Sequence, residues 1–196
     1  MWTAVEVRWY DPAVLLPGSL VDIHCPACLL RPLVPADAES LARHADDRDV
    51  WRNLRDLFPH PYSVEDARGD IAMASSRTPQ TSFGIVVDGE AAGSVSLRPG
   101  TDVERASAEI GYWLGRAYWG RGVMTGAVRA ATQYAFTTLG MHRVWAVPFE
   151  HNAASCRVLE KAGYVLEGRL RRSAIKEGVV VDQWMWAAYD DRQPGA

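Results

Sequence analysis

Hydrophobic and polar positions alternate near the start of the chain, where "TAVEVRWY" has the pattern of a short strand that "DPAVLLPGS" interrupts. Residues 28–33 predict a further strand, followed by a helix whose start is marked by Pro35 and Asp37. A short helix, a proline-rich turn and a second helix after Ser63 come next. Ser63 and Asp66 resemble a capping box, with Asp in place of the usual Glu or Gln.

The spacing of apolar positions then changes to the period of strands. "SFGIVVDGEAAGSVSLRP" predicts two strands joined by an Asp88-Gly89 turn, and "RASAEIGYWLG" predicts a third. A glycine-rich segment leads into a helix that runs to about Leu139. "MHRVWAVPF" predicts a strand, and "NAASCRVLEKAG" predicts a short helix that Asn152 caps and Gly163 stops. Two strands close the chain.

This order of elements predicts a single α+β (mixed α/β) domain. We assign residues 28–189 to that domain, residues 1–27 to an N-terminal extension and residues 190–196 to a C-terminal tail. The extension is expected to pack onto the domain or onto a second copy of the chain, which leaves a homodimer open.

Composition narrows the function classes. The 196 residues are 48% hydrophobic and 23% charged, which is typical of one globular domain with a real core. The formal net charge of −3 and the lack of a basic tail argue against a nucleic-acid partner. No long apolar stretch predicts a membrane span, and Pro17 breaks the apolar run that a signal peptide would need. A cytoplasmic protein is therefore expected.

The three cysteines form an odd set, which argues against a disulfide framework. Cys25 and Cys28 form a "CPAC" motif, but His24 is the only nearby further ligand, and zinc needs about four. The motif also leads into "LLRPL" rather than into the strand-to-helix context of a redox dithiol. A structural role without a bound metal is favoured, and metal or redox chemistry is the alternative.

The segment "YWGRGVMTGAV" contains the most informative glycines. A Walker loop needs GxxxxGK[ST], which the chain lacks, and a Rossmann turn needs GxGxxG, whereas Gly126 comes one residue too late after Gly120 and Gly122. What remains is a turn of small residues that opens an apolar helix. The first amides of that helix, to about Thr125, have no intrahelical partner and form an anion site, with Arg121 at its rim. A tight turn without a ligand is the alternative.

"AEIGYWLGRAYWGRGVMTGAV" followed by "HNAASCRVLEKAGYVLEGRLR" resembles the GNAT superfamily of acyl-CoA N-acyltransferases, and within it the RimJ/RimL branch. "NLRDLFPHPYSVEDA" is similar to the acceptor-side segment of that branch, and the resemblance spans about 28–187. It implies a GNAT-like domain with a splayed, mostly antiparallel central sheet flanked by helices. Acyl-pantetheine then lies in the gap beside the strand at 108–114.

The resemblance also implies where acetyl-CoA binds as co-substrate. Its pyrophosphate is expected on main-chain amides of the glycine-rich turn, and its pantetheine next to the end of the strand. The family signature [Q/R]-x-x-G-x-[G/A], aligned on its middle glycine, meets a Trp and a Met at its first and last positions. The implied contacts are Trp113, Leu114, Trp119, Gly120, Arg121, Gly122, Val123, Met124, Thr125 and Asn152.

The implied reaction is attack of a neutral amine on the acyl-CoA carbonyl. Deprotonating a lysine at neutral pH costs about 4–5 kcal/mol, and an α-amine only about 1–1.5 kcal/mol, so an α-amine needs only a weak base or a water relay. Glu109 is the candidate base, with a solvated or arginine-paired glutamate as the alternative; a second glutamate found in some relatives is replaced by Ala174. Ser155, in "NxxS", is the candidate acid, with a purely helix-capping motif as the alternative.

The expected function is that of an N-acetyltransferase acting on a primary amine, either a protein N-terminus or a small molecule. Transfer of a larger acyl group such as succinyl, and a non-catalytic acyl-CoA-binding module, are the alternatives. Tryptophans are more often core than pocket residues, and Asp182 is expected to be paired or to face the site. The residues expected to line the acceptor pocket are Asn53, Arg55, Phe58, Tyr62 and Trp184.

Overall fold

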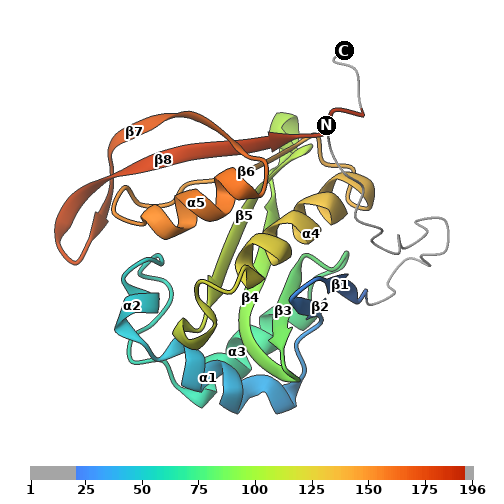
Figure 1. Ribbon diagram of the computed structural model, residues 1–196, viewed down its shortest axis with the longest axis vertical. Coiled ribbons are helices and arrows are strands. Elements are labelled where there is room, and N and C mark those ends of the chain that lie inside the picture. The colour runs from blue at the N-terminus through green and yellow to red at the C-terminus, as the bar shows by residue number, and fades with distance from the viewer. Residues whose placement is uncertain (1–20, 193–196) are drawn as a thin grey trace.

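An open sheet of eight strands crosses the molecule in the computed structural model, which describes residues 21–192 (Figure 1). The strands lie in the order β1-β2-β3-β4-β5-β6-β8-β7, and only β5 and β6 are parallel neighbours. The expected mixed α/β domain with a mostly antiparallel sheet is confirmed. The strands are Ile23–Cys25 (β1), Cys28–Arg31 (β2), Ser82–Val87 (β3), Glu90–Pro99 (β4), Ser107–Leu114 (β5), Arg143–Ala146 (β6), Val165–Lys176 (β7) and Val179–Tyr189 (β8).

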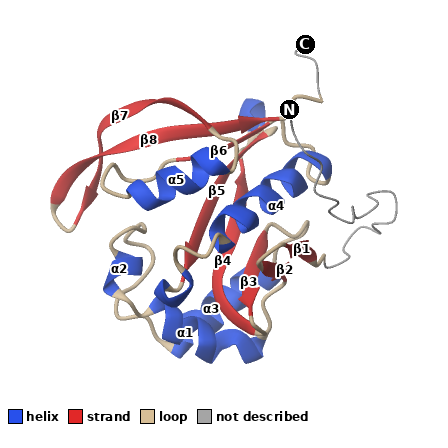
Figure 2. Ribbon diagram, viewed as in Figure 1, coloured by secondary structure: helices blue, strands red, loops and turns tan. Residues whose placement is uncertain are grey.

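Helices pack on both faces of the sheet. Helix α4 contacts β4 and β5 from one side, whereas α1 contacts β4 and α3 from the other. Ala91 and Ala92, neighbours on β4, belong to different apolar clusters because successive strand residues point to opposite faces. In Figure 2 the helices α1, α2 and α3 gather at the lower end of the view, apart from α4 and α5. The helices are Ala38–Ala45 (α1), Arg48–Trp51 (α2), Val64–Ser75 (α3), Val123–Thr137 (α4) and Ala153–Lys161 (α5).

Local sequence signals set several of these boundaries. The predicted capping box begins α3: the carboxylate of Asp66 accepts a hydrogen bond from the amide of Ser63 at 2.8 Å, and the Ser63 hydroxyl accepts one from the amide of Asp66 at 3.2 Å. The predicted hairpin joins β3 to β4, with Asp88 and Gly89 at φ of 52° and 84°. Before α1, residues Pro35–Asp37 form a 3-10 turn.

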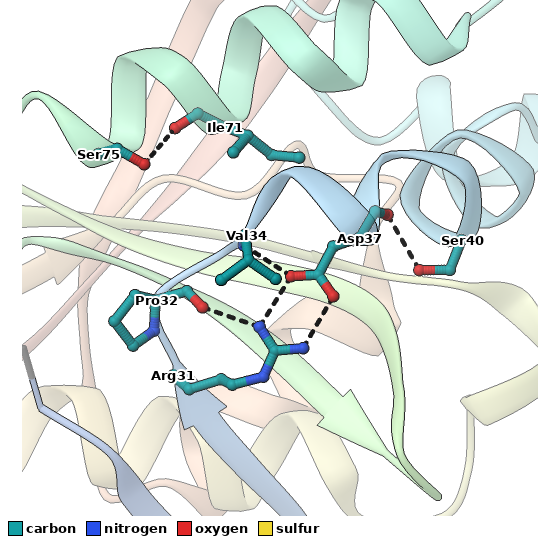
Figure 3. A network of polar contacts seen from close by, with 7 residues as sticks. All are labelled: Arg31, Pro32, Val34, Asp37, Ser40, Ile71 and Ser75. Atoms are coloured by element: carbon teal, nitrogen blue, oxygen red, sulfur yellow. Dashed lines mark hydrogen bonds and ion pairs between the residues drawn. The ribbon is translucent and has the colours of Figure 1, made fainter.

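A buried carboxylate ties the end of β2 to that turn (Figure 3). Arg31 donates to both carboxylate oxygens of Asp37, at 2.7 and 2.8 Å, and the amide of Val34 donates at 2.8 Å. Burial opposes ionisation of this group, but the hydrogen bonds from Arg31 and Val34 lower the pKa of Asp37 below its usual value. The network therefore fixes the connection between the sheet and α1.

The start of the sheet lies within the segment that we assigned to the extension. Strand β1, at Ile23–Cys25, pairs with β2 and was not predicted from the sequence. The strand expected at "TAVEVRWY" lies outside the described residues. The division into extension, domain and tail stays a prediction.

Candidate active site

The two central strands β5 and β6 run side by side and then part. Seven residue pairs join β5 to β4, from Ala108 to Leu114. Only the first three residues of β5, which end at Glu109, pair with β6. Beyond Glu109 the edge of β5 that faces β6 has no strand partner among residues 21–192. Backbone polar groups in such a gap need another partner, so an extended polar ligand fits there.

A cleft of about 650 Å³ follows this gap. Every residue of β5 from Glu109 to Leu114 lines it, together with residues 53–55 and 57–59, the glycine-rich turn and the start of α5. The cleft brings together most of the residues that the sequence analysis selected. Those that line it are Asn53, Arg55, Phe58, Glu109, Trp113, Leu114, Trp119, Gly120, Gly122, Val123, Met124, Thr125, Asn152 and Ser155.

The glycine-rich turn leaves the beginning of α4 open. Gly120 and Gly122 have φ of +74° and +76°, a left-handed conformation that favours glycine. Gly122 is the N-cap of α4, and within the described chain no side chain caps the helix. A Cβ built on either glycine would meet no described atom within 4 Å. The geometry of Gly120–Thr125, called the open start of α4 below, therefore fits the expected anion site.

Trp119 and Arg121, which flank Gly120, point in different directions. The indole Nε1 of Trp119 donates to the carbonyl of Leu114 at 2.7 Å, so this side chain fastens the turn to the end of β5. Nη2 of Arg121 lies 3.4 Å from the carboxylate of Asp88, and its guanidinium lies 5.2 Å from the ring centroid of Tyr118. Arg121 itself does not line the cleft, although Tyr118 does, so its guanidinium is directed toward Asp88 at the rim.

Glu109 lies where β5 and β6 separate, and two arginines pair with it. Nη2 of Arg55 contacts Oε1 of Glu109, and Nη2 of Arg98 lies 3.4 Å from the same oxygen. Arg98 is the residue opposite Glu109 on β4. The Glu109 side chain is 12% exposed, whereas those of Arg55 and Arg98 are 53% and 41% exposed. The arginine pairing expected as the alternative is thus present, at the mouth of the gap.

Ser155 stands at the start of α5 and faces β5. The side chain of Asn152 accepts a hydrogen bond from the amide of Ser155 at 3.0 Å, which makes Asn152 the N-cap. The hydroxyl of Ser155 lies 2.7 Å from that of Tyr112 on β5. Burial raises the pKa of Tyr112, so its hydroxyl stays protonated at neutral pH. The capping motif and the orientation toward the cleft therefore coexist.

The candidate base and the candidate acid approach β5 from opposite faces. Tyr112 packs against the apolar cluster that contains α4. Trp113 packs against the cluster of α1 and α3, with its ring 5.7 Å from that of Phe58. Because side chains alternate along a strand, Glu109 shares the face of Trp113, whereas Ser155 meets the face of Tyr112. The gap between β5 and β6 connects the two faces.

Tyr62 and Trp184 do not line the cleft, contrary to expectation. Tyr62 is buried beneath the acceptor side, where its hydroxyl donates to Asp70 at 2.5 Å and its ring stacks on Phe58 at 4.7 Å. Trp184 lies on β8 with the guanidinium of Arg169 5.4 Å from its ring centroid. Tyr62 therefore supports the cleft residue Phe58 from beneath, whereas the ring of Trp184 is covered by Arg169 away from the cleft.

The cleft also contains residues that could not be selected from the sequence, and the polar ones nearest the proposed chemistry are Tyr112, Arg98, Arg157 and Lys161. Arg157 and Lys161 stand one turn apart on α5, so both project toward the same side of the helix. That i, i+4 spacing, on the helix that Asn152 opens, was the signal available in the sequence. The position of Arg98 follows only from the register between β4 and β5.

Residues 28–165 of the chain match the acetyltransferase (GNAT) domain. The chain belongs to the GNAT acetyltransferase family. It is 36% identical over 173 residues to the probable N-acetyltransferase YjcK of Bacillus subtilis (strain 168), an alignment that covers 84% of this chain and 96% of YjcK. It is 28% identical over 142 residues to the spermidine N(1)-acetyltransferase of Escherichia coli (strain K12), covering 72% of this chain and 74% of that enzyme.

Among solved structures, Mycobacterium smegmatis RimJ in complex with CoA-disulfide is similar to this GNAT chain with a TM-score of 0.76. The sequences are 25% identical, and the match covers 92% of this chain and 91% of RimJ. The predicted resemblance to the RimJ/RimL branch of N-acetyltransferases is confirmed. Acetyl-CoA-dependent acetylation of an amine is supported as the general activity.

Residues 21–192 contain no helix that is long and apolar enough to cross a membrane. Within the same residues, no group of three or more His, Cys, Asp or Glu side chains is arranged to hold a metal ion. Cys25 and Cys28 are free thiols at opposite ends of the β1–β2 turn, and Cys28 Sγ lies 4.0 Å from the carbonyl of Val123. They pack beside the first turn of α4.

Proposed function

We propose that this GNAT protein transfers an acetyl group from acetyl-CoA to a primary amine, with protein α-amines and small-molecule amines as the acceptor classes. The observation that carries the proposal is that one cleft joins the open start of α4, the unpaired edge of β5, Glu109 and Ser155. An anion site, a place for an extended chain and two proton-transfer groups therefore lie in one connected space.

The residues of the cleft suit the parts of acetyl-CoA. The open start of α4 would bind the pyrophosphate, because its backbone amides and the helix dipole favour an anion. Pantetheine would lie along the edge of β5 near Trp113 and Leu114, beside Asn152. Arg157 and Lys161 on α5 would add positive charge for the remaining phosphate. The amides concerned are those of Gly120, Gly122, Val123, Met124 and Thr125.

Acetyl-CoA supplies an activated acyl group with a thiolate as the leaving group. Glu109 would accept the proton that the amine loses, directly or through a water. Ser155 would donate its hydroxyl proton to the departing sulfur, and Tyr112 would replace it through their shared hydrogen bond. An α-amine suits this arrangement, because its deprotonation at neutral pH costs only about 1–1.5 kcal/mol.

Transfer of an anionic acyl group such as succinyl is the second candidate. The observation that favours it is the pair Arg55 and Arg98, whose guanidinium groups line the cleft beside Glu109. Arginine is well suited to bind a carboxylate through two parallel hydrogen bonds. The two candidates differ in which acyl-CoA the protein uses.

The experiment is to measure thiol release from acetyl-CoA and from succinyl-CoA with a panel of peptides and small amines. Titration calorimetry with each acyl-CoA measures binding independently. Faster release with acetyl-CoA supports the proposal, and faster release with succinyl-CoA supports the second candidate. Binding of the acyl-CoA with no acceptor raising thiol release above background would instead identify a non-catalytic binding module.

A further inference from the structure

The two arginines at Glu109 leave the acceptor side of the cleft with an excess of positive charge. Both guanidinium groups meet the same oxygen, Oε1 of Glu109. One carboxylate offsets one of the two positive charges. Each guanidinium has five N–H donors, and side chains that are 53% and 41% exposed keep some of these donors available to a ligand.

The surroundings of this pair add further positive charge. The cleft continues along the same face of the sheet toward α3, where Arg77 also lines it. The only other acidic residue that lines the described cleft is Asp70. Its carboxylate accepts a hydrogen bond from the hydroxyl of Tyr62, with 2.5 Å between the two oxygens. A polyamine would therefore meet like charge at this end, which disfavours its binding.

The part of the sheet between these charges is made of small residues. Ser96 on β4 is opposite Gly111 on β5, and Ser82 on β3 is opposite Ser96, so these residues follow one another across the sheet. A Cβ on Gly111 would lie 3.1 Å from Nη2 of Arg98. Gly111 thus lets the Arg98 side chain lie across this part of the sheet, beside the base that the amine must reach.

The position of the arginines points to the acceptor rather than to the acyl group. Arg98 is on β4, on the side of β5 that is away from the gap with β6. Glu109 shares the face of β5 on which Trp113 packs against Phe58, whereas the open start of α4 and Ser155 are on the opposite face. A ligand that reaches Arg98 therefore comes from the α1 and α3 side of the sheet.

We propose that Arg55 and Arg98 select acceptors that carry a carboxylate close to the reactive amine. This inference rests on the proposed function, since it specifies the acceptor of that same site. The carboxylate of the acceptor binds a guanidinium that otherwise pairs with Glu109. Oε1 of Glu109 is then free to accept a hydrogen bond from the N–H of the amine. An anionic acceptor thereby helps to uncover the base that it needs, and a cationic one does not.

The test uses the full chain with acetyl-CoA and amidated peptides that begin with Ala and carry Asp, Asn or Lys at the second position. Alanine and alaninamide, which differ only in the carboxylate beside the amine, form a second, free amino-acid arm. We expect kcat/KM to be about tenfold higher for the member of a pair that carries the carboxylate than for its partner, and lowest among the peptides for the Lys peptide. A preference in the peptide arm alone identifies acidic protein N-termini as the acceptor class. A preference in the amino-acid arm alone identifies free amino acids as the acceptor class.

Arg55→Gln and Arg98→Gln should each reduce the ratio of kcat/KM between the acidic and the neutral peptide, because each removes a guanidinium beside Glu109. Arg68→Gln is the matched control, because Arg68 pairs with Glu65 on the exposed surface of α3. Equal kcat/KM for the three peptides, or a preference that survives both substitutions, would overturn the inference. Loss of succinyl-CoA use in these variants, with the peptide preference intact, would also overturn it.

Binding separates this inference from the proposed function. The CoA-loaded protein should bind the Asp peptide more tightly than the Asn peptide in calorimetry, and added salt should reduce the difference. If no acceptor supports thiol release but this binding difference is present, the proposed function fails and the charge selection stands. If acceptors are acetylated but their charge has no effect on kcat/KM or on binding, the inference alone fails.

Discussion

The hydroxyl oxygens of Tyr112 and Ser155 lie 2.7 Å apart, so β5 is hydrogen-bonded to the first turn of α5 beside the gap where β5 and β6 part. Either oxygen can be the donor. When Ser155 gives its proton to a leaving sulfur, the protonated Tyr112 is placed to restore it. This pair therefore gives the candidate acid a second proton source within the protein.

Ser155→Ala is expected to lower kcat about 100-fold, within the range typical of general acid–base groups. The substitution keeps the backbone amide that Asn152 caps, so α5 should retain its start. Tyr112→Phe is expected to lower kcat less, by about tenfold, with KM for acetyl-CoA unchanged. Steady-state thiol release measures both parameters.

Tyr164→Phe is the matched control for the tyrosine substitution. Tyr164 is also buried, and its hydroxyl lies 2.7 Å from that of Thr132 on α4. The Tyr164→Phe variant should be less stable but keep the kcat of the wild type, because Tyr164 lies outside the cleft. A Ser155→Ala variant with kcat within twofold of wild type would show that the Ser155 hydroxyl has no catalytic role and that the residue only forms part of the start of α5.

Gly122→Ala tests whether the open start of α4 binds the pyrophosphate. Gly122 and Gly140 have φ of +76° and +67°, and a Cβ on either meets no described atom within 4 Å. An alanine at either position carries a similar backbone cost of about 1–2 kcal/mol. We expect Gly122→Ala to raise the Kd for CoA at least tenfold in calorimetry, because its methyl group enters the space of the phosphate. Gly140→Ala should leave Kd unchanged, and an equal Kd in the two variants would contradict the assignment.

Asn152 has two proposed roles that substitution can separate. Asn152→Ala removes the N-cap and should lower the free energy of unfolding by about 1 kcal/mol, whereas Asn152→Ser keeps an oxygen that can cap. If the amide of Asn152 also contacts pantetheine, both variants should bind acetyl-CoA several-fold more weakly. Urea unfolding measures the change in stability of the two variants, and calorimetry measures their affinity for acetyl-CoA. Normal affinity in Asn152→Ser would limit Asn152 to the capping role.

Features set within a few residues could be predicted from the sequence. The Ser63 capping box and the Asp88-Gly89 turn depend on bonds between near neighbours, and both were correct. Such signals identify helix and strand ends, because the partners are already adjacent along the chain. Asp182 was expected on other grounds, the cost of burying a lone carboxylate, to be paired or site-facing, and it pairs with Nε of Arg169 on the neighbouring strand at 2.7 Å.

Features that depend on distant pairing could not be derived in this way. The place where β5 and β6 part follows from residues 107–109 pairing with residues 143–145, and only the family resemblance suggested it. Arg98 reaches Glu109 through strand register. Arg121 stands between two cleft residues and Tyr62 is three residues from Pro59, but neither lines the cleft, because contacts with Asp88 and Asp70 hold their side chains elsewhere. The three residues of β1 carry too little pattern to identify a strand.

Asp37→Asn tests the buried network that joins β2 to α1. The variant loses a carboxylate that accepts three hydrogen bonds, two from Arg31 and one from the amide of Val34. Hydrogen bonds to charged groups contribute about 1.5–3 kcal/mol, so we expect the free energy of unfolding to fall by about 2 kcal/mol at pH 7. Glu65→Gln, which alters an exposed ion pair with Arg68, should change it by less than about 0.5 kcal/mol.

The pH dependence gives this prediction its sharpest test. Folding lowers the pKa of Asp37 below its usual value, so the ionised carboxylate stabilises the fold fully at pH values above that usual value. As pH falls below about 4, the unfolded chain takes up the proton first, and the wild type loses this stabilisation. The difference in unfolding free energy between wild type and Asp37→Asn should therefore be constant from pH 6 to 8 and shrink toward pH 3, as measured by urea denaturation. A difference that stays the same at pH 3 would show that the charge of Asp37 contributes nothing to the network.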